Sequence, residues 1–273
     1  MQDSDWLVQG LVAVSEICES PLVLIATCIV LMVLSCGALA LTSRLLTLCG
    51  GAVGPGAPAL QAGLTEGVVA FVLALQTGLI EIEMPARIGA LSIILFVVLA
   101  SLLQSCLDLT TPVLLSLPAT NRRLLRHLPA LLLLAALLLS PLLMVHALLT
   151  RVSSDLWTLV IISSCLVTAI QATGSLATYI LFVWDSSLET PSPHIDDYVY
   201  YVKATSRSGE LLLAVAVVCC GFWESLGDTR EWSLVNSLVL VVHCYFNIYS
   251  RISQGWASYL QRRQTSMYVV ILE

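Results

Sequence analysis

The chain has 273 residues, of which 58% are hydrophobic and only 11% are charged, with a formal net charge of −6. Soluble domains are about one-quarter charged, so this composition excludes an ordinary soluble domain. The net negative charge is spread along the chain, so the sequence does not indicate a nucleic-acid-binding protein. The mean hydropathy of +0.92 comes from apolar blocks of about 20 residues, the length that crosses hydrocarbon as a helix. The sequence therefore predicts an all-α, polytopic integral membrane helix bundle of about seven transmembrane helices.

About seven apolar spans follow an acidic segment at residues 1–20, which we expect to lie in the lumen. That segment lacks the basic start and the cleavage pattern of a signal peptide, so the first span is expected to direct insertion. Residues 21–250 are predicted to form one membrane domain, followed by a cytosolic amphipathic tail at 251–273. The spans cover approximately residues 21–43, 64–80, 88–107, 128–149, 157–183, 210–225 and 232–250.

Three prolines mark expected interruptions of these helices. Pro112 and Pro118 follow the third span, where we expect them to end the helix and turn the chain. Pro141 lies inside the fourth span, and we expect a bend there, because neighbouring helices can satisfy the carbonyl group that a proline leaves without its donor.

Lysine and arginine gather on one side of the predicted bundle. If the carboxyl terminus is cytosolic, nine of the 12 basic residues face the cytosol, and only Arg87, Arg151 and Arg230 face the lumen. This assignment makes the loops at 108–127 and 185–208 cytosolic and the amino terminus lumenal. A miscounted short span, the second or the sixth, would break the assignment.

The nine cysteines lie almost entirely in apolar runs, and no pair has the Cys-x-x-Cys spacing of a zinc site. We interpret them as buried thiols, which pack as small hydrophobic side chains. The sequence also lacks the Gly-x-Ser-x-Gly and His-Glu-x-x-His motifs of hydrolases. We therefore predict no catalytic residue, no metal ligand and no cofactor in this chain.

The fifth span carries small and polar residues at helical spacing, among them Gln171, Thr173, Gly174 and Thr178. Such residues let helices approach closely in lipid, and Gln171 can form a hydrogen bond with a neighbouring helix. Two interpretations remain open: a tight packing face between helices, or the border of a cleft for a sterol or another lipid.

Four further polar residues lie in the predicted spans. Glu66 and Glu210 are expected in the first turns of their helices, where the helix dipole stabilises an acid. His243 and Asn247 lie one turn apart in the seventh span and are predicted to form a polar pair inside the bundle.

Residues 185–207, DSSLETPSPHIDDYVYYVKATSR, form the most distinctive soluble segment. Its dense tyrosines suit either an aromatic belt at the membrane surface or a cytosolic docking site, and its paired aspartates are expected to cap the helix that carries the tyrosines. The candidate docking residues are Asp196, Asp197, Tyr198, Tyr200 and Tyr201.

Three stretches in the second half of the chain carry a family resemblance. They are DLWTLVIISSCLVTAIQATGSLATYILFV at 155–183, IDDYVYYVKATSR at 195–207 and HCYFNIYSRISQGWASYLQRR at 243–263. In order and spacing they resemble the membrane domain of the RING-type E3 ubiquitin ligases related to the translocation-in-renal-carcinoma chromosome-eight protein. The resemblance covers about residues 120–265, and hydropathy alone extends it toward the amino terminus.

The resemblance implies a multispan domain of the endoplasmic reticulum membrane that selects membrane substrates or senses sterol, joined to a cytosolic RING domain that recruits an E2 enzyme. It implies roles in protein ubiquitination and endoplasmic-reticulum-associated degradation. The expected partners are the lipid bilayer, membrane substrates, and a RING-bearing ligase or an E2 enzyme. Trp256 and Tyr259 are expected to anchor an amphipathic segment at the membrane surface.

The last ten residues depart from the pattern of that family. After Arg263 the chain reads QTSMYVVILE, without the zinc ligands of a RING. We therefore expect a membrane-embedded recognition or scaffold module without its own ubiquitin transfer, and we expect zinc only if a RING follows.

Two other classes of membrane protein also fit the predicted helix count. A seven-helix receptor agrees with the lumenal amino terminus, but LQSCLDLTTP at the end of the third helix lacks the acid–arginine pair of rhodopsin-like receptors. A transporter or channel is the other alternative, although paired broken helices with central charges are missing.

Overall fold

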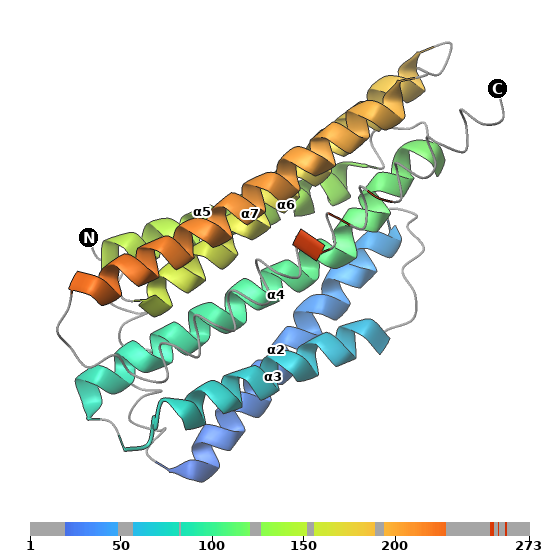
Figure 1. Ribbon diagram of the computed structural model, residues 1–273. Helices are drawn as coiled ribbons and strands as arrows, with labels where there is room; N and C mark the ends of the chain where they lie inside the picture. Colours follow the sequence, from blue (N-terminus) through green and yellow to red (C-terminus); the bar gives the residue numbers. More distant parts are fainter. Residues whose placement is uncertain are drawn as a thin grey trace.

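A computed structural model describes residues 20–48, 57–81, 83–120, 127–151, 156–188 and 194–227, together with Ile252, Ser253, Trp256 and Leu260. Within these residues the regular structure is entirely helical, which confirms the predicted fold class. The helices are α2 (Pro21–Leu48), α3 (Ala57–Gln76), α4 (Met84–Thr120), α5 (Leu128–Arg151), α6 (Leu156–Ser187) and α7 (Ile195–Gly227) (Figure 1).

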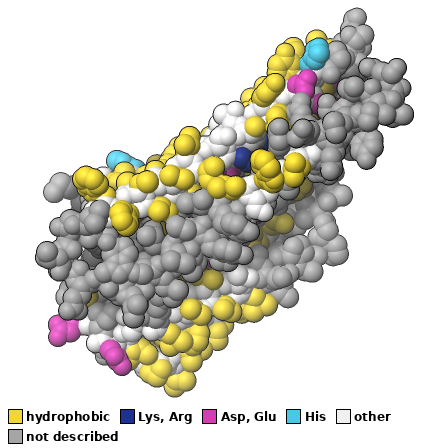
Figure 2. Space-filling view, viewed as in Figure 1, with side chains coloured by type: hydrophobic (Ala, Val, Ile, Leu, Met, Phe, Trp, Pro, Cys, Tyr) yellow, Lys and Arg dark blue, Asp and Glu magenta, His cyan; other side chains and the backbone are white. Residues whose placement is uncertain are grey.

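Five of these helices are long and apolar enough to cross a membrane: α2, α4, α5, α6 and α7. In α3 the apolar part is shorter, Gly63–Leu75. Large hydrophobic side chains lie exposed along the outer faces of the described helices (Figure 2), as lipid-facing surfaces require. The chain is therefore a multi-pass membrane protein. The predicted seventh span, 232–250, lies outside the described residues.

Two predicted boundaries are wrong. The third span does not end at residue 107, because α4 continues to Thr120 with Pro112 and Pro118 inside it. Val113, Leu114 and Leu117 are buried in this stretch, so packing keeps the helix intact although each proline removes one backbone N–H donor.

The second wrong boundary concerns the predicted loop 185–208. Residues 195–208 belong instead to α7, which runs without a break into the predicted sixth span. The charged residues Lys203 and Arg207, which suggested a loop, lie on a helix and line a cavity between α4, α6 and α7.

The helices are arranged around α4, which runs between α2 and α3 on one side and α5, α6 and α7 on the other (Figure 1). On that second side α6 is central, because it packs against α4, α5 and α7. The main apolar core joins α2, α4, α5 and α6 and includes Leu39, Leu107, Leu114, Leu134 and Ala172. Helix α6 therefore contributes to the walls of the hollows described below.

The pairing of α2 with α3 depends on two glycines one turn apart. A Cβ atom at Gly63 would collide with Cys36 Sγ and lie 2.9 Å from the Cys36 backbone nitrogen. A Cβ atom at Gly67 would lie 2.8 Å from Met32 Cβ. This Gly-x-x-x-Gly pattern lets the two backbones approach closely, as small residues do between helices in lipid.

Candidate functional site

A row of polar side chains runs along one face of α4 where it packs on α6. Ser101, Gln104, Asp108 and Thr111 follow one another at intervals of three or four residues, so they share a face of the helix. On α6 the same spacing brings Thr168, Gln171, Ser175 and Thr178 to one face. We call these eight residues the polar seam.

Hydrogen bonds join the two sides of the polar seam. The Thr168 hydroxyl donates to Gln104 Oε1 at 2.9 Å, and Gln104 Nε2 donates to Gln171 Oε1 at 2.7 Å and to Asp108 Oδ1 at 3.1 Å. Farther along, the hydroxyls of Thr111 and Ser175 lie 3.2 Å apart. Gln104 thus links three polar partners, and its bonds fix the register of α4 against α6.

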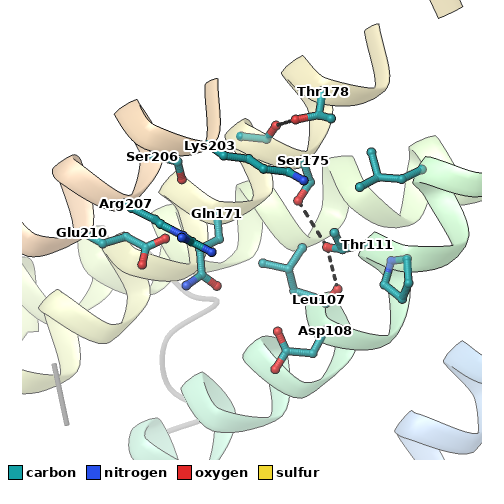
Figure 3. A pocket seen from close by; sticks show the side chains of 13 residues that line it. Leu107, Asp108, Thr111, Gln171, Ser175, Thr178, Lys203, Ser206, Arg207 and Glu210 are labelled. Carbon is teal, nitrogen blue, oxygen red and sulfur yellow. Dashed lines mark hydrogen bonds between the residues drawn. The ribbon is translucent and has the colours of Figure 1, made fainter. Parts of the chain in front are cut away.

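The polar seam opens into a cavity of about 330 Å³ between α4, α6 and α7. Figure 3 shows charged side chains from α4 and α7 directed into this cavity, with Lys203 extending toward Ser175. Two acids and two bases contribute: Asp108, Lys203, Arg207 and Glu210. Of these four, Glu210 is buried and the other three are exposed. A buried ionisable group in a membrane protein usually marks a functional site, because burying a charge is costly.

The two glutamates expected in first turns lie elsewhere. Glu210 is in the middle of α7, because that helix begins at Ile195, and its side chain is 5% exposed. Glu66 is in the middle of α3 and is 2% exposed. Its Oε1 atom accepts a hydrogen bond of 2.6 Å from the Ser101 hydroxyl, and its Oε2 atom has no partner among the described residues. Both predictions of a dipole-stabilised cap are therefore wrong.

A second, apolar groove of about 680 Å³ lies between α5, α6 and α7. Its walls include Leu138, Leu142 and Ile170, and Tyr201 and Thr205 add hydroxyl groups. This groove therefore offers a long apolar surface with a few polar groups, which is typical of a site for a hydrophobic ligand.

The four candidate residues of the fifth predicted span divide between these two hollows. Gln171 and Thr178 line the charged cavity, Thr173 lines the apolar groove, and Gly174 lines both. Gly174 also allows a close approach of α7, because a Cβ atom there would lie 3.1 Å from Ser206 Oγ. These residues therefore lie partly in a close helix contact and partly on the walls of two hollows, and the sterol or lipid cleft stays a prediction.

The candidate docking residues all lie in the first two turns of α7. Asp196 and Asp197 occupy the first turn, and Asp197 Oδ2 is 3.7 Å from Nδ1 of His194. Tyr198 and Tyr201 are exposed, and the rings of Tyr200 and Tyr201 pack edge to face, with centroids 5.9 Å apart. These residues therefore begin a membrane helix rather than occupy a free loop.

The remaining candidates lie at the carboxyl end of the chain. Trp256 is helical and 63% exposed. Tyr259, His243 and Asn247 are outside the described residues, so their predicted roles stay predictions.

The sequence analysis missed Gln104 and Asp108 and placed Lys203 and Arg207 in a loop. The available signal was the three-and-four spacing from Ser101 to Thr111, which continues past the predicted end of the third span. No group of three or more His, Cys, Asp or Glu side chains suited to a metal occurs in the part of the chain that the structure describes.

Comparison with known proteins identifies the domain type. The family model of the TRC8 N-terminal domain matches residues 2–256. Human RING finger protein 145 is 40% identical over 207 residues, which are 76% of this chain and 31% of that protein. Human E3 ubiquitin-protein ligase RNF139 is 30% identical over 202 residues, 74% of this chain and 30% of that protein. Protein TRC8 homolog of Drosophila melanogaster is 28% identical over 205 residues, 74% of this chain and 25% of that protein.

These alignments cover most of this chain but a smaller share of each relative. The chain spans about a third or less of the length of the curated relatives it matches. No solved structure matches the chain.

Proposed function

This chain belongs to the TRC8 N-terminal domain family, and from that premise we propose that it is a membrane-embedded recognition and scaffold module of a RING-type E3 ubiquitin ligase system. Human RNF139 is named an E3 ubiquitin-protein ligase, and the other human relative is a RING finger protein. The match over residues 2–256 carries the proposal. It does not favour the receptor or the transporter interpretation.

In this role the module selects membrane proteins for ubiquitination in endoplasmic-reticulum-associated degradation. The apolar outer faces of α2 and α5 offer surface for membrane-spanning segments of substrates, with Leu34 and Leu143 among the exposed side chains. The hydrogen bonds of Gln104 hold α4 and α6 in one register, as a scaffold requires. A RING-bearing ligase or an E2 enzyme is the proposed cytosolic partner.

Affinity purification of the full chain from membranes tests this function. The chain is expected to recover ubiquitin-pathway proteins together with ubiquitinated membrane proteins, and its depletion is expected to lengthen the half-lives of those membrane proteins. Recovery of membrane proteins whose ubiquitination and half-lives do not respond to depletion would refute the proposal. An unrelated membrane protein of similar helix number, expressed at the same level, is the control.

The proposed location is the endoplasmic reticulum membrane, with a lumenal amino terminus and a cytosolic carboxyl terminus. This topology requires α3 to cross the membrane, so that the α3–α4 turn is lumenal and the α6–α7 connection is cytosolic. Glu81 and Leu188 are exposed in those two connections. In sealed microsomes of a variant with Cys219→Ser and Cys220→Ser, an impermeant maleimide should label Leu188→Cys but not Glu81→Cys. The reverse pattern would overturn the topology.

A sterol response is a second proposed property, supported by the apolar groove between α5, α6 and α7. Its volume of about 680 Å³ and its hydroxyl groups suit a rigid, mostly apolar ligand with one polar end. A bulky side chain at Thr173, which lines the groove, should reduce photo-crosslinking to a sterol probe. Thr173→Phe is the test, and Ile180→Phe, at an exposed position of the same helix, is the matched control. Equal crosslinking of both variants would exclude the groove.

A further inference from the structure

A third hollow, of about 340 Å³, lies between α4, α6 and α7, one turn along α4 from the charged cavity. We call it the central cavity. Its polar lining side chains are Ser101, Gln104, Ser163, Ser164 and Thr168. Among the described residues that line it, none carries a charge. The central cavity therefore suits a neutral ligand that forms hydrogen bonds.

The α4 side of the central cavity offers hydrogen-bond acceptors. Ser101 donates its proton to Glu66 Oε1 at 2.6 Å, and Thr168 donates its proton to Gln104 Oε1 at 2.9 Å. The carboxamide of Gln104 uses both of its N–H groups in the polar seam. A hydroxyl oxygen that donates its proton keeps lone pairs with which it can accept. The oxygen atoms of Ser101 and Thr168 can therefore accept hydrogen bonds from a ligand.

Two adjacent serines of α6 add a donor. Ser163 and Ser164 both donate to the backbone carbonyl of Val160, at 2.8 Å and 3.0 Å. A helical carbonyl also accepts from the backbone N–H four residues later, so it stays satisfied when one hydroxyl turns away. Ser163 is 3% exposed, whereas Ser164 is exposed and marks where the central cavity opens to the outside. The Ser164 hydroxyl can therefore turn toward an incoming ligand.

We propose that the central cavity binds the carboxamide side chain of a glutamine or asparagine in a membrane-spanning helix of another protein. This proposal rests on the proposed function, in which the module selects membrane proteins. A carboxamide has two N–H donors and one carbonyl acceptor. Its N–H groups lie against the hydroxyl oxygens of Ser101 and Thr168, and its carbonyl oxygen accepts from Ser164. A charged side chain would find no counter-ion among the described lining residues.

The depth of the central cavity favours a side chain over a lipid headgroup. The part of α4 that can cross a membrane is Ala86–Pro118, and Ser101 lies 15 residues from its first residue and 17 from its last. Polar groups of lipids lie at the two surfaces of a hydrocarbon layer about 30 Å thick, so they do not reach its middle. A carboxamide at the middle of a spanning helix does, and a hydrogen bond to a neighbouring helix satisfies it.

The apolar walls of the central cavity leave room for a partner helix. Val97, Ala100, Val167 and Ala214 line it. Small side chains let helix backbones approach closely in lipid, so a glutamine or asparagine on the partner can reach the hydroxyl groups.

The test uses the full chain, reconstituted in vesicles of dioleoyl phosphatidylcholine with a synthetic spanning helix of about 20 leucine and alanine residues. The synthetic helix carries at its centre either glutamine or methionine, which are similar in size but differ in hydrogen bonding. A diazirine derivative of leucine lies one turn away. On illumination the glutamine helix should crosslink to the chain at least about fivefold more than the methionine helix, as expected for one hydrogen bond between model membrane helices.

Variants of the central cavity show where the synthetic helix binds. Ser163→Ala combined with Ser164→Ala removes two hydroxyl groups and should lower the preference for glutamine to less than about twofold. Val167→Trp narrows the cavity but keeps every polar group, and it should have the same effect. The matched control is Ser186→Ala combined with Ser187→Ala, an adjacent pair whose hydroxyls also bond within α6, and it should keep the wild-type preference. Size-exclusion profiles show which variants fold.

Equal crosslinking of the two synthetic helices by wild-type protein would overturn the proposal, as would a glutamine preference that survives in both cavity variants. Loss of the preference when dioleoylglycerol is added in excess would assign the cavity to a lipid hydroxyl instead. A preference that appears only in Asn247→Leu would assign it to the predicted span 232–250 of this chain. The vesicles contain no ubiquitin-pathway protein, so failure here leaves the proposed function to the purification and half-life experiment.

Discussion

Glu66 and Glu210 are both buried glutamates in the middle of a helix, but the regions around them differ. Glu66 lies where α2, α3 and α4 pack tightly, beside the glycines of α3, and its visible partner is the neutral hydroxyl of Ser101. Glu210 lies on a cavity of about 330 Å³ that also contains two bases and a second acid. The comparison shows that burial of a carboxyl group does not by itself indicate a ligand site. The space and the charge around the carboxyl group decide between packing and binding.

The largest expected loss of stability comes from adding a side chain at Gly63, where α2 and α3 pack closely. In Gly63→Ala the new methyl group collides with Cys36, including its backbone nitrogen at 2.9 Å, so one helix must move. Overpacking of this kind costs about 1–3 kcal/mol, and we expect the upper end because backbone rather than a flexible side chain blocks the methyl group. Thermal unfolding in detergent measures the change.

Gly37→Ala is the control for this prediction, because a methyl group there meets nothing within 4 Å. Replacing a helical glycine in open space should leave stability unchanged or raise it by up to about 1 kcal/mol. Equal stability of the two variants would show that α2 and α3 do not approach as closely as the structure has them.

The next effect concerns the hydrogen bond between Ser101 and Glu66. Ser101→Ala leaves the buried carboxyl group without its visible donor, and the expected cost is about 1–3 kcal/mol. Adding Glu66→Met should recover much of that loss, because replacing both partners by apolar groups removes the unsatisfied atoms. A double-mutant cycle with stability as the readout measures the coupling. Ser92→Ala is the control, since within the part of the chain that the structure describes that hydroxyl bonds to its own helix at Ile88.

A smaller effect is expected from the polar seam itself. Gln104→Leu removes the hydrogen bonds to Thr168, Gln171 and Asp108, and hydrogen bonds between membrane helices are worth about 0.6 kcal/mol on average. The summed cost should be about 1–2 kcal/mol. Ser164→Ala, whose hydroxyl bonds to Val160 of its own helix, should cost less than half as much. If Gln104→Leu loses no more stability than Ser164→Ala, the polar seam does not set the register of α4 against α6.

Hydropathy predicted the helical membrane fold because long apolar blocks have few other stable structures in lipid. It failed at Pro112, since whether a proline ends a helix depends on packing against segments that are distant in sequence. It failed again at Lys203 and Arg207, because charges that suggest a loop can equally face a cavity formed by other helices. Gln171 and Gly174 were predicted as a face of one helix, but their division between two hollows depends on where α4, α5 and α7 pack.

The smallest effect is expected at Gly174, which lies between the charged cavity and the apolar groove. It is therefore the residue to compare with Gly63, which lies where α2 and α3 pack tightly. A methyl group at Gly174 would lie 3.1 Å from the hydroxyl of Ser206 and 3.2 Å from its Cβ atom. The neighbour here is a side chain whose hydroxyl can rotate, and cavities lie on either side of the contact, so α7 can shift by a few tenths of an ångström. We therefore expect Gly174→Ala to change the free energy of unfolding by no more than about 0.5 kcal/mol, against several times that for Gly63→Ala. If the two variants lose equal stability in the same unfolding assay, the two regions are packed equally tightly.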